Sequence, residues 1–186
     1  MNITIIGGAD GPTSIFLAGK LGNTFSTPAF LILFLFYGTY FAKAIAQKRQ
    51  GIKTSQLGHG KAKPVRITEI ILSAATVLIV PVQTVSILFD WNIMPTWGRI
   101  AGIAAGLTGD LLFLAAVITM KNSWRAGIPE SGKTEFVSRG IYKYSRNPAF
   151  LGFDLMYAGI LFMYFNWLSL LFSLWAAVML HLQILQ

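Results

Sequence analysis

The chain has 186 residues, of which 54% are hydrophobic and only 12% are charged, and its 15 Lys and Arg against 7 Asp and Glu give a formal net charge of +8. A soluble domain typically carries about twice this charged fraction, so the composition excludes an ordinary soluble domain and indicates an integral membrane protein. The sequence has no cysteine, which excludes disulfides and cysteine-based metal sites, and its two histidines, His59 and His181, lie in different regions, so no metal centre is expected.

Residues 1–26 differ from the rest of the chain and are interpreted as a leader segment. Pro12 suits the first position of a helix, so Asp10 is expected to cap a short helix that begins there. The string Gly-Gly-Ala-Asp-Gly-Pro-Thr-Ser-Ile-Phe, residues 7–16, resembles a segment of the sodium-translocating decarboxylase beta subunits. In that family the aspartate lies on the ion path, so the resemblance implies an ion-transport role for Asp10 as an alternative to a simple leader.

Five stretches with few or no charged residues follow, and a membrane-spanning helix needs about 20 apolar residues. The first three stretches reach that length, and the short turn Tyr164–Trp167 separates the last two, which predicts a helical hairpin with aromatic residues at a membrane interface. The expected fold is all-α: a polytopic membrane protein with about five transmembrane helices. Residues 27–120 would form a three-helix scaffold, and 121–186 a cytoplasmic loop followed by the hairpin. The stretches are residues 21–42, 70–89, 100–120, 149–165 and 168–186.

Positive charge is concentrated in two loops. Seven of the 15 Lys and Arg lie between Lys43 and Arg66, and six more lie between Lys121 and Arg146. Basic loops tend to stay in the cytoplasm, so we expect the N-terminus outside the cell membrane and the C-terminus inside. The same charge favours contact with anionic membrane lipids. Neither loop carries aromatic residues at a stacking spacing, so no nucleic-acid partner is expected.

The membrane helices themselves contain several unusual residues. The second helix is expected to begin near Thr68 and to kink at Pro81. Glycines at 102, 106 and 109 in the third helix would let helices approach closely, either within the chain or in a helix-mediated oligomer. Asp110 and Asp154 are costly inside a bilayer and should face a partner or a cavity.

The loop that leads into the fourth helix has the features of a binding site. Pro148 suits the first helical turn, and Asn147 is the expected cap. A helix start presents free N–H groups and a partial positive charge, which suit a carboxylate, and Arg146 beside it could bind an anion with two donors.

Aromatic residues surround this helix start. Gly140 would allow close backbone approach, and the rings of Tyr142, Tyr144 and Phe150 could flank a planar ligand. The loop therefore reads either as a site for a ligand with a carboxylate and an aromatic ring, or as a basic, aromatic interfacial anchor.

The order Trp-Arg-x-Gly (from Trp124), Thr134, Gly-Ile-Tyr (from Gly140) and Arg-Asn-Pro-x-Phe-Leu-Gly (from Arg146) resembles the isoprenylcysteine carboxyl methyltransferase family and its phospholipid methyltransferase relatives. The resemblance covers roughly the region from Lys121 to the end. It implies a membrane methyltransferase that uses S-adenosylmethionine and transfers a methyl group to a lipid-like or small apolar acceptor, such as a prenylcysteine carboxylate.

The resemblance also implies a site. Arg146 would align an anionic group on the acceptor or the cofactor, as the catalytic residue, and His181 lies near another cofactor contact of the family. The implied cofactor-binding residues are Tyr142, Arg146, Asn147, Pro148, Phe150, Leu151, Gly152 and His181.

Two departures from the family pattern stand out. Phe150 replaces the usual tyrosine and removes a hydroxyl group. Family members continue with a Glu-Glu pair and a basic, aromatic tail that closes the cofactor pocket, and neither follows Gln186, so the resemblance implies a pocket without one wall. Two alternatives therefore remain beside the methyltransferase: a non-catalytic membrane protein that keeps the hairpin, and a sodium-translocation component.

Overall fold

The structure is a computed structural model and describes residues 3–4, 18–19, 23–58, 62–127 and 137–185. Asp10, His59 and the decarboxylase-like string lie outside these residues. Five α-helices follow one another as the hydropathy predicts, with a two-residue antiparallel strand pair before them and two 3-10 helices between α3 and α4. The elements are β1 (Ile3–Thr4), β2 (Ala18–Gly19), α1 (Ser26–Arg49), α2 (Lys63–Leu88), α3 (Thr96–Met120), η1 (Lys121–Ser123), η2 (Gly140–Lys143), α4 (Pro148–Met163) and α5 (Trp167–Ile184).

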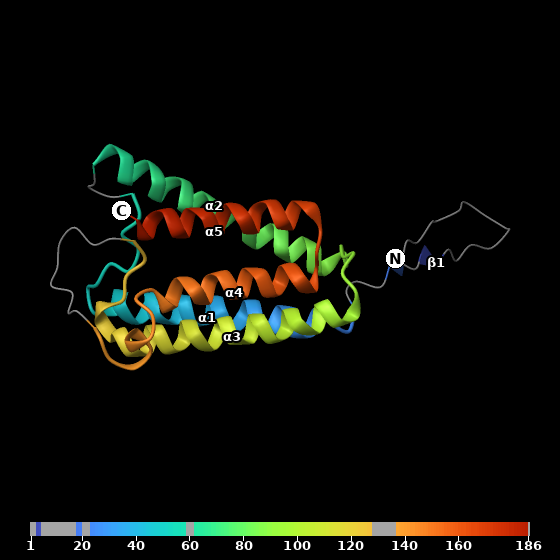
Figure 1. Ribbon diagram of the computed structural model, residues 1–186, viewed down its shortest axis with the longest axis horizontal. Coiled ribbons are helices and arrows are strands. Elements are labelled where there is room, and N and C mark those ends of the chain that lie inside the picture. The colour runs from blue at the N-terminus through green and yellow to red at the C-terminus, as the bar shows by residue number, and fades with distance from the viewer. Residues whose placement is uncertain (1–2, 5–17, 20–22, 59–61, 128–136, 186) are drawn as a thin grey trace.

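All five helices run between the same two ends of the molecule (Figure 1). Four of them, α1, α2, α3 and α5, are long and apolar enough to cross a membrane, while α4 is a shorter apolar helix of 16 residues. At about 1.5 Å per residue α4 rises roughly 24 Å, somewhat less than a hydrocarbon core of about 30 Å. The polytopic membrane fold is confirmed: among the described residues four helices are long enough to span, and the fourth predicted stretch, which is short in the sequence, is the shorter helix α4.

The start of α2 differs from the prediction. The helix begins at Lys63, with Pro64 in its first turn, rather than near Thr68. The hydropathy of this first turn is low because Lys63 and Arg66 lie in it, but long basic side chains can extend toward water while their backbone stays helical. Pro81 lies inside α2, as expected.

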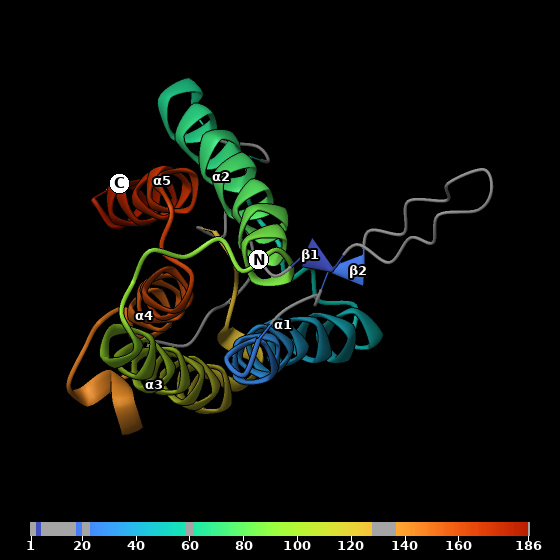
Figure 2. The same cartoon turned by 90° about the vertical axis from the view of Figure 1, so that its right-hand side faces the viewer.

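The helices pack in two layers, one formed by α2 and α5 and the other by α1, α3 and α4. Helices that follow one another in the chain are therefore not always the main packing partners. Helix α4 packs chiefly against α3, and α5 chiefly against α2, while α1 lies beside α3 (Figure 2). The last two helices do form the predicted hairpin through the turn after Met163, but each finds its main partner elsewhere. Contact between α4 and α5 is consequently limited.

Glycines bring α3 and α4 together at backbone distance. A Cβ atom on Gly109 would lie 2.7 Å from the carbonyl oxygen of Gly152, and one on Gly159 would lie 2.5 Å from the backbone nitrogen of Gly106. Real Cβ atoms are essentially never found so close to other heavy atoms. The small residues of α3 therefore serve packing within this chain, as close helix contact in a membrane requires.

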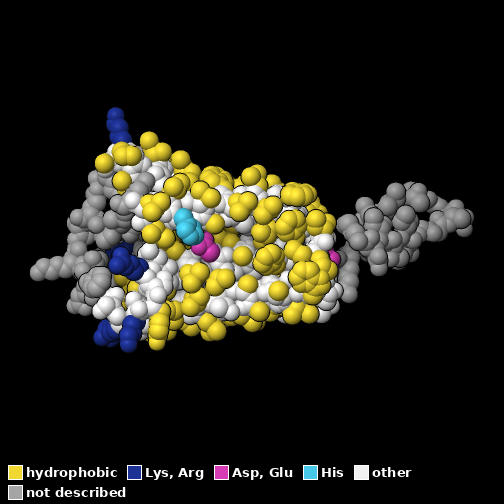
Figure 3. Space-filling model, viewed as in Figure 1, with side chains coloured by type: hydrophobic (Ala, Val, Ile, Leu, Met, Phe, Trp, Pro, Cys, Tyr) yellow, Lys and Arg dark blue, Asp and Glu magenta, His cyan; other side chains and the backbone are white. Residues whose placement is uncertain are grey.

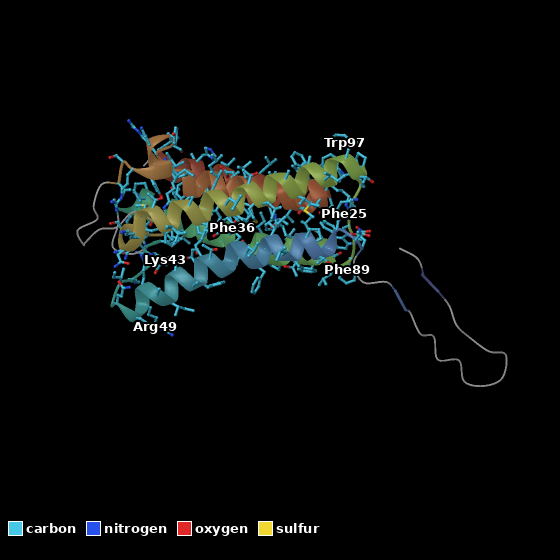
Figure 4. All side chains as sticks on the ribbon, turned by 90° about the horizontal axis from the view of Figure 1, so that it is seen from below. Phe25, Phe36, Lys43, Arg49, Phe89 and Trp97 are labelled. Atoms are coloured by element: carbon cyan, nitrogen blue, oxygen red, sulfur yellow. The ribbon has the colours of Figure 1, made fainter. Side chains whose placement is uncertain are left out.

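An aromatic cluster joins α1, α3 and α4 in the core. The rings of Phe36 and Phe113 stack with centroids 4.4 Å apart, and Phe153 meets both edge-on. Trp124, which follows η1, packs its ring against Phe113 and is buried. Figure 4 shows Phe36 midway along α1, with Lys43 and Arg49 toward one end and Phe25 at the other.

Apolar and charged side chains occupy different parts of the surface, as is usual for a membrane protein. Apolar side chains cover much of the side of the bundle that Figure 3 shows, and the Lys and Arg side chains visible there lie at one end, which we call the basic end. The chain's described C-terminal helix finishes at the basic end, and α1 begins at the opposite end (Figure 1).

Arg99 closes the opposite end of the bundle. Its guanidinium lies 3.2 Å from Asp90 and 4.3 Å above the ring of Phe25, and only 7% of the residue is exposed. Asn23 accepts hydrogen bonds from Arg99 and from the hydroxyl of Tyr164. One cation therefore ties the start of α1, the end of α2, the start of α3 and the end of α4.

Candidate functional site

The candidate site lies at the basic end, where η2 leads into α4. Gly140 has φ +59, and a Cβ atom there would meet the Thr119 side chain at 3.0 Å, so both the backbone conformation and the neighbouring side chain favour glycine at this position. The turn places Tyr142 against the core and Tyr144 in the open, 88% exposed. Of the three proposed ring-flanking residues, Tyr142 and Phe150 are partly buried, and Tyr144 is the freely accessible one.

Helix α4 begins at Pro148, as predicted, but the predicted side-chain cap by Asn147 is not formed. Pro148 occupies the first helical turn, yet Asn147 makes no side-chain hydrogen bond to the helix. Its ψ of 56 is far from the extended value of 160 that lets Asn166 cap α5. The Asn147 backbone N–H instead donates to Ser145 Oγ at 3.2 Å. The predicted cap is therefore wrong, and within the described part of the chain no side-chain hydrogen bond caps the first turn of α4.

Arg146 and Asn147 are both exposed beside this helix start. Burial raises the pKa of Tyr142 to about 12, so its phenol stays neutral at physiological pH and can donate a hydrogen bond. An exposed guanidinium, an uncapped helix N-terminus and a neutral phenol are all donors. Together they suit a ligand rich in acceptors and carrying a carboxylate.

The other predicted cofactor-binding residues of α4, Phe150, Leu151 and Gly152, do not share one environment. Leu151 is exposed on the apolar side of α4. Gly152 is buried against α3, where a Cβ atom would lie 2.9 Å from Phe113 Cβ. Phe150 packs against the core. Leu151 and Gly152 thus have a membrane-facing and a packing position respectively, and the accessible donors are those of Arg146 and its neighbours.

The Trp-Arg-x-Gly motif, residues 124–127, is joined by hydrogen bonds to the segment that follows α1 at the basic end. Ala126 N donates to Thr54 O at 3.0 Å, and Gln56 N donates to Ala126 O at 2.7 Å, so residues 54–56 pair with this segment. Gln47, completely buried, donates to Trp124 O and accepts from the Thr54 hydroxyl. These hydrogen bonds of Gln47 were not predicted from the sequence. A polar side chain in a largely apolar helix was the sequence feature that could have indicated them.

His181 lies apart from the η2–α4 junction along the chain and pairs with Asp154. Its Nδ1 is 3.8 Å from Asp154 Oδ2 and 2.8 Å from the carbonyl oxygen of Ala177. Asp154 therefore has a partner, as expected of a carboxylate in the membrane. Asp110, by contrast, is buried and its two carboxylate oxygens make no hydrogen bond with the described residues. Among the described residues there is no group of three potential metal ligands.

S-adenosylmethionine, the cofactor that the resemblance implies, fits the donors at the junction. It carries a carboxylate, which suits Arg146 and the uncapped α4 start, and a planar adenine, which suits the Tyr142 and Tyr144 rings. Sulfonium chemistry requires no metal. The chemistry of the donor set is thus consistent with this group.

A bundle of apolar helices with exposed hydrogen-bond donors at its basic end is the architecture of a polytopic membrane protein. The sequence model of the Isoprenylcysteine carboxyl methyltransferase (ICMT) family matches residues 102–186, and the matched part contains the motif that indicated a resemblance to this family. The match begins inside α3, upstream of Lys121, so it includes the glycine-mediated α3–α4 contact. The match supports a protein of the membrane methyltransferase kind. No curated protein and no solved structure matches the chain.

Proposed function

We propose that the protein is an S-adenosylmethionine-dependent methyltransferase that transfers a methyl group to a lipid-like acceptor. The observation that carries the proposal is the start of α4: an uncapped helix N-terminus beside the exposed Arg146, within the region that matches the methyltransferase family. The donors at this start complement the carboxylate of the cofactor.

Arg146 and the first-turn N–H groups of α4 would hold that carboxylate, with Tyr142 alongside as a neutral donor. When bound, S-adenosylmethionine supplies a methyl group activated by its sulfonium. The protein then needs to align the acceptor with that methyl group and to exclude water, because displacement at a sulfonium carbon needs little acid–base chemistry. The backbone hydrogen bonds of Ala126 to Thr54 and Gln56, next to the buried Trp124, would keep the basic end rigid.

The apolar sides of the bundle favour an acceptor that enters from the bilayer (Figure 3). The site lies at the basic end, and basic segments tend to be cytoplasmic, so the proposed orientation puts the site and the end of α5 in the cytoplasm and the start of α1 outside. Water-soluble cofactor and membrane-soluble acceptor would then meet at one boundary.

Calorimetric titration of the detergent-purified protein with S-adenosylmethionine tests the proposal. Wild-type protein should bind, and Arg146→Ala should bind at least about ten-fold more weakly, since a charge-assisted pair is worth roughly 1.5–3 kcal/mol. Arg139→Ala is the matched control, because it removes an exposed arginine of the same loop. Absence of heat from wild-type protein at millimolar ligand would argue for a non-catalytic role.

A further inference from the structure

Asp154 and His181 form a polar pair in the otherwise apolar region between α4 and α5. Asp154 lies six residues after Pro148, which corresponds to about 9 Å along the helix axis from the start of α4. The pair is therefore deeper in the membrane than Arg146 but within reach of a ligand that extends inward from it.

The pair is accessible from the side of the bundle. Helix α5 packs chiefly on α2 and α4 chiefly on α3, so the two hairpin helices leave their shared flank only partly closed. The side chain of His181 is 64% exposed and that of Asp154 is 22% exposed. Figure 3 shows a histidine side chain at the surface with an acidic side chain beside it, on a face that carries many apolar side chains. A membrane-soluble molecule can approach both side chains laterally.

The free polar atoms of this pair are acceptors. His181 Nδ1 lies 2.8 Å from Ala177 O, a geometry that assigns its proton to Nδ1 and leaves Nε2 as an acceptor. Asp154 Oδ1 is buried and makes no hydrogen bond with the described residues. The 3.8 Å between Nδ1 and Oδ2 is longer than a direct hydrogen bond. The carboxylate thus has no direct hydrogen bond with the described residues, and because Oδ1 is enclosed, a donor from outside would reach it through Oδ2.

Two acceptors and one negative charge favour a cation with several N–H donors. A carboxylate ligand would meet the Asp154 charge at short range in a medium of low dielectric, where like charges repel strongly. A primary ammonium group has three donors and the opposite charge. The pair therefore discriminates by charge between amines and carboxylic acids of equal apolar length.

We propose that Asp154 and His181 bind the ammonium group of a membrane-soluble amine, and that this amine is the methyl acceptor. The inference rests on the proposed function and specifies its substrate class. Asp154 binds the cation. Transfer of one N–H proton from the ammonium to His181 Nε2 leaves a neutral amine, whose lone pair can accept a methyl group, and an imidazolium held by Asp154.

Other titratable groups surround the pair. On α4 and α1 they are the phenols of Tyr157 and Tyr37, which lie near Asp154 and near each other. On α2 the carboxylate of Glu69 accepts from Gln183 of α5 at 3.2 Å and from Gly58 N at 2.7 Å. The bonds to Glu69 engage that carboxylate, whereas Asp154 retains an oxygen without a hydrogen bond.

The test measures acceptor binding without cofactor. Dodecylamine, dodecanoic acid and dodecanol have the same chain and differ in headgroup, and each is titrated into the detergent-solubilised protein while its melting temperature is recorded. Dodecylamine should stabilise the wild type most, and Asp154→Asn should weaken that binding about ten-fold or more. Asp110→Asn is the matched control, since it neutralises another aspartate within a membrane helix, one that is buried, and it should leave amine binding unchanged.

Activity provides the second measurement. With labelled S-adenosylmethionine, Asp154→Asn should raise KM for the amine, whereas His181→Gln should chiefly lower kcat, a split that a general loss of folding would not produce. Stabilisation by the acid equal to that by the amine, or unchanged amine binding in Asp154→Asn, would overturn the inference. If Asp154→Asn does not fold, the wild-type comparison of the three headgroups decides alone. Cofactor binding by calorimetry separates the two proposals: intact cofactor binding with no amine preference rejects only this one.

Discussion

Gly109 of α3 and Gly152 of α4 face each other across the tightest helix pair of the bundle, with only 2.7 Å between a Cβ atom built on Gly109 and the Gly152 carbonyl oxygen. The contact is backbone on backbone, so no side chain can move aside to relieve a clash. Because α4 begins at the candidate site, the spacing of α3 and α4 fixes where Pro148 and Arg146 lie.

Gly109→Ala should therefore destabilise the protein by about 1–3 kcal/mol, the usual cost of overpacking a well-packed core. Gly38→Ala is the control, since nothing lies within 4 Å of a Cβ atom at that position. Thermal unfolding in detergent measures both. A melting temperature for Gly109→Ala equal to or above the wild type would show that the two helices can separate without cost.

The buried Gln47 predicts a local effect at the basic end. Gln47→Ala removes the hydrogen bonds that hold Trp124 and Thr54, and amides at residues 54–56 and 124–126 should then exchange hydrogen faster than in the wild type. Gln50→Ala removes a hydrogen bond to Asn122 at an exposed site and should change exchange little. Equal exchange in the two variants would contradict an anchoring role for Gln47.

Arg99 predicts an effect at the opposite end. Arg99→Ala loses the contacts to Phe25 and Asp90 together and should cost about 1–3 kcal/mol of unfolding free energy. Cofactor binding at the basic end should stay unchanged, because the cluster lies at the far end of the helices. Reduced stability combined with normal calorimetric binding is the expected pattern, and a loss of binding at retained stability would refute this separation.

The burial of Tyr142 should make the melting temperature fall at high pH. Its pKa rises from 10.0 to about 12 on folding because burial disfavours the phenolate, so its contribution to stability is complete below pH 10 and is lost as the pH rises through 12. The drop in melting temperature between pH 9 and pH 11.5 should be smaller in Tyr142→Phe than in the wild type. Tyr144→Phe, at an exposed position, should behave like the wild type; a smaller drop in this variant as well would remove the link to burial.

Hydropathy was sufficient to predict the five helices, since each is an apolar stretch bounded by charges or turn residues. The helix partners were not predictable this way. Apolar faces of similar composition can pack on any neighbour, and α5 therefore lies on α2 rather than chiefly on α4. The glycines of α3 correctly indicated a close helix contact, but only the structure assigns that contact to Gly152 and Gly159.

The candidate site was predicted in composition better than in geometry. Gly140 and Pro148 occupy the conformations that their residue types suggested. Asn147 does not cap α4, because capping depends on backbone angles that residue type alone does not determine. The Asp154–His181 pair joins residues from α4 and α5, which pack chiefly against α3 and α2, and a local sequence pattern does not predict which residues of two such helices meet.

Transfer of a labelled methyl group from S-adenosylmethionine to lipid in membranes that contain the protein tests the central claim most directly. Membranes with the wild type should incorporate label into an extractable lipid fraction, and membranes with equal amounts of folded Arg146→Ala should incorporate at least about ten-fold less. Incorporation by the wild type no higher than in membranes without the protein, or equal incorporation by Arg146→Ala, would contradict a methyltransferase site at the start of α4.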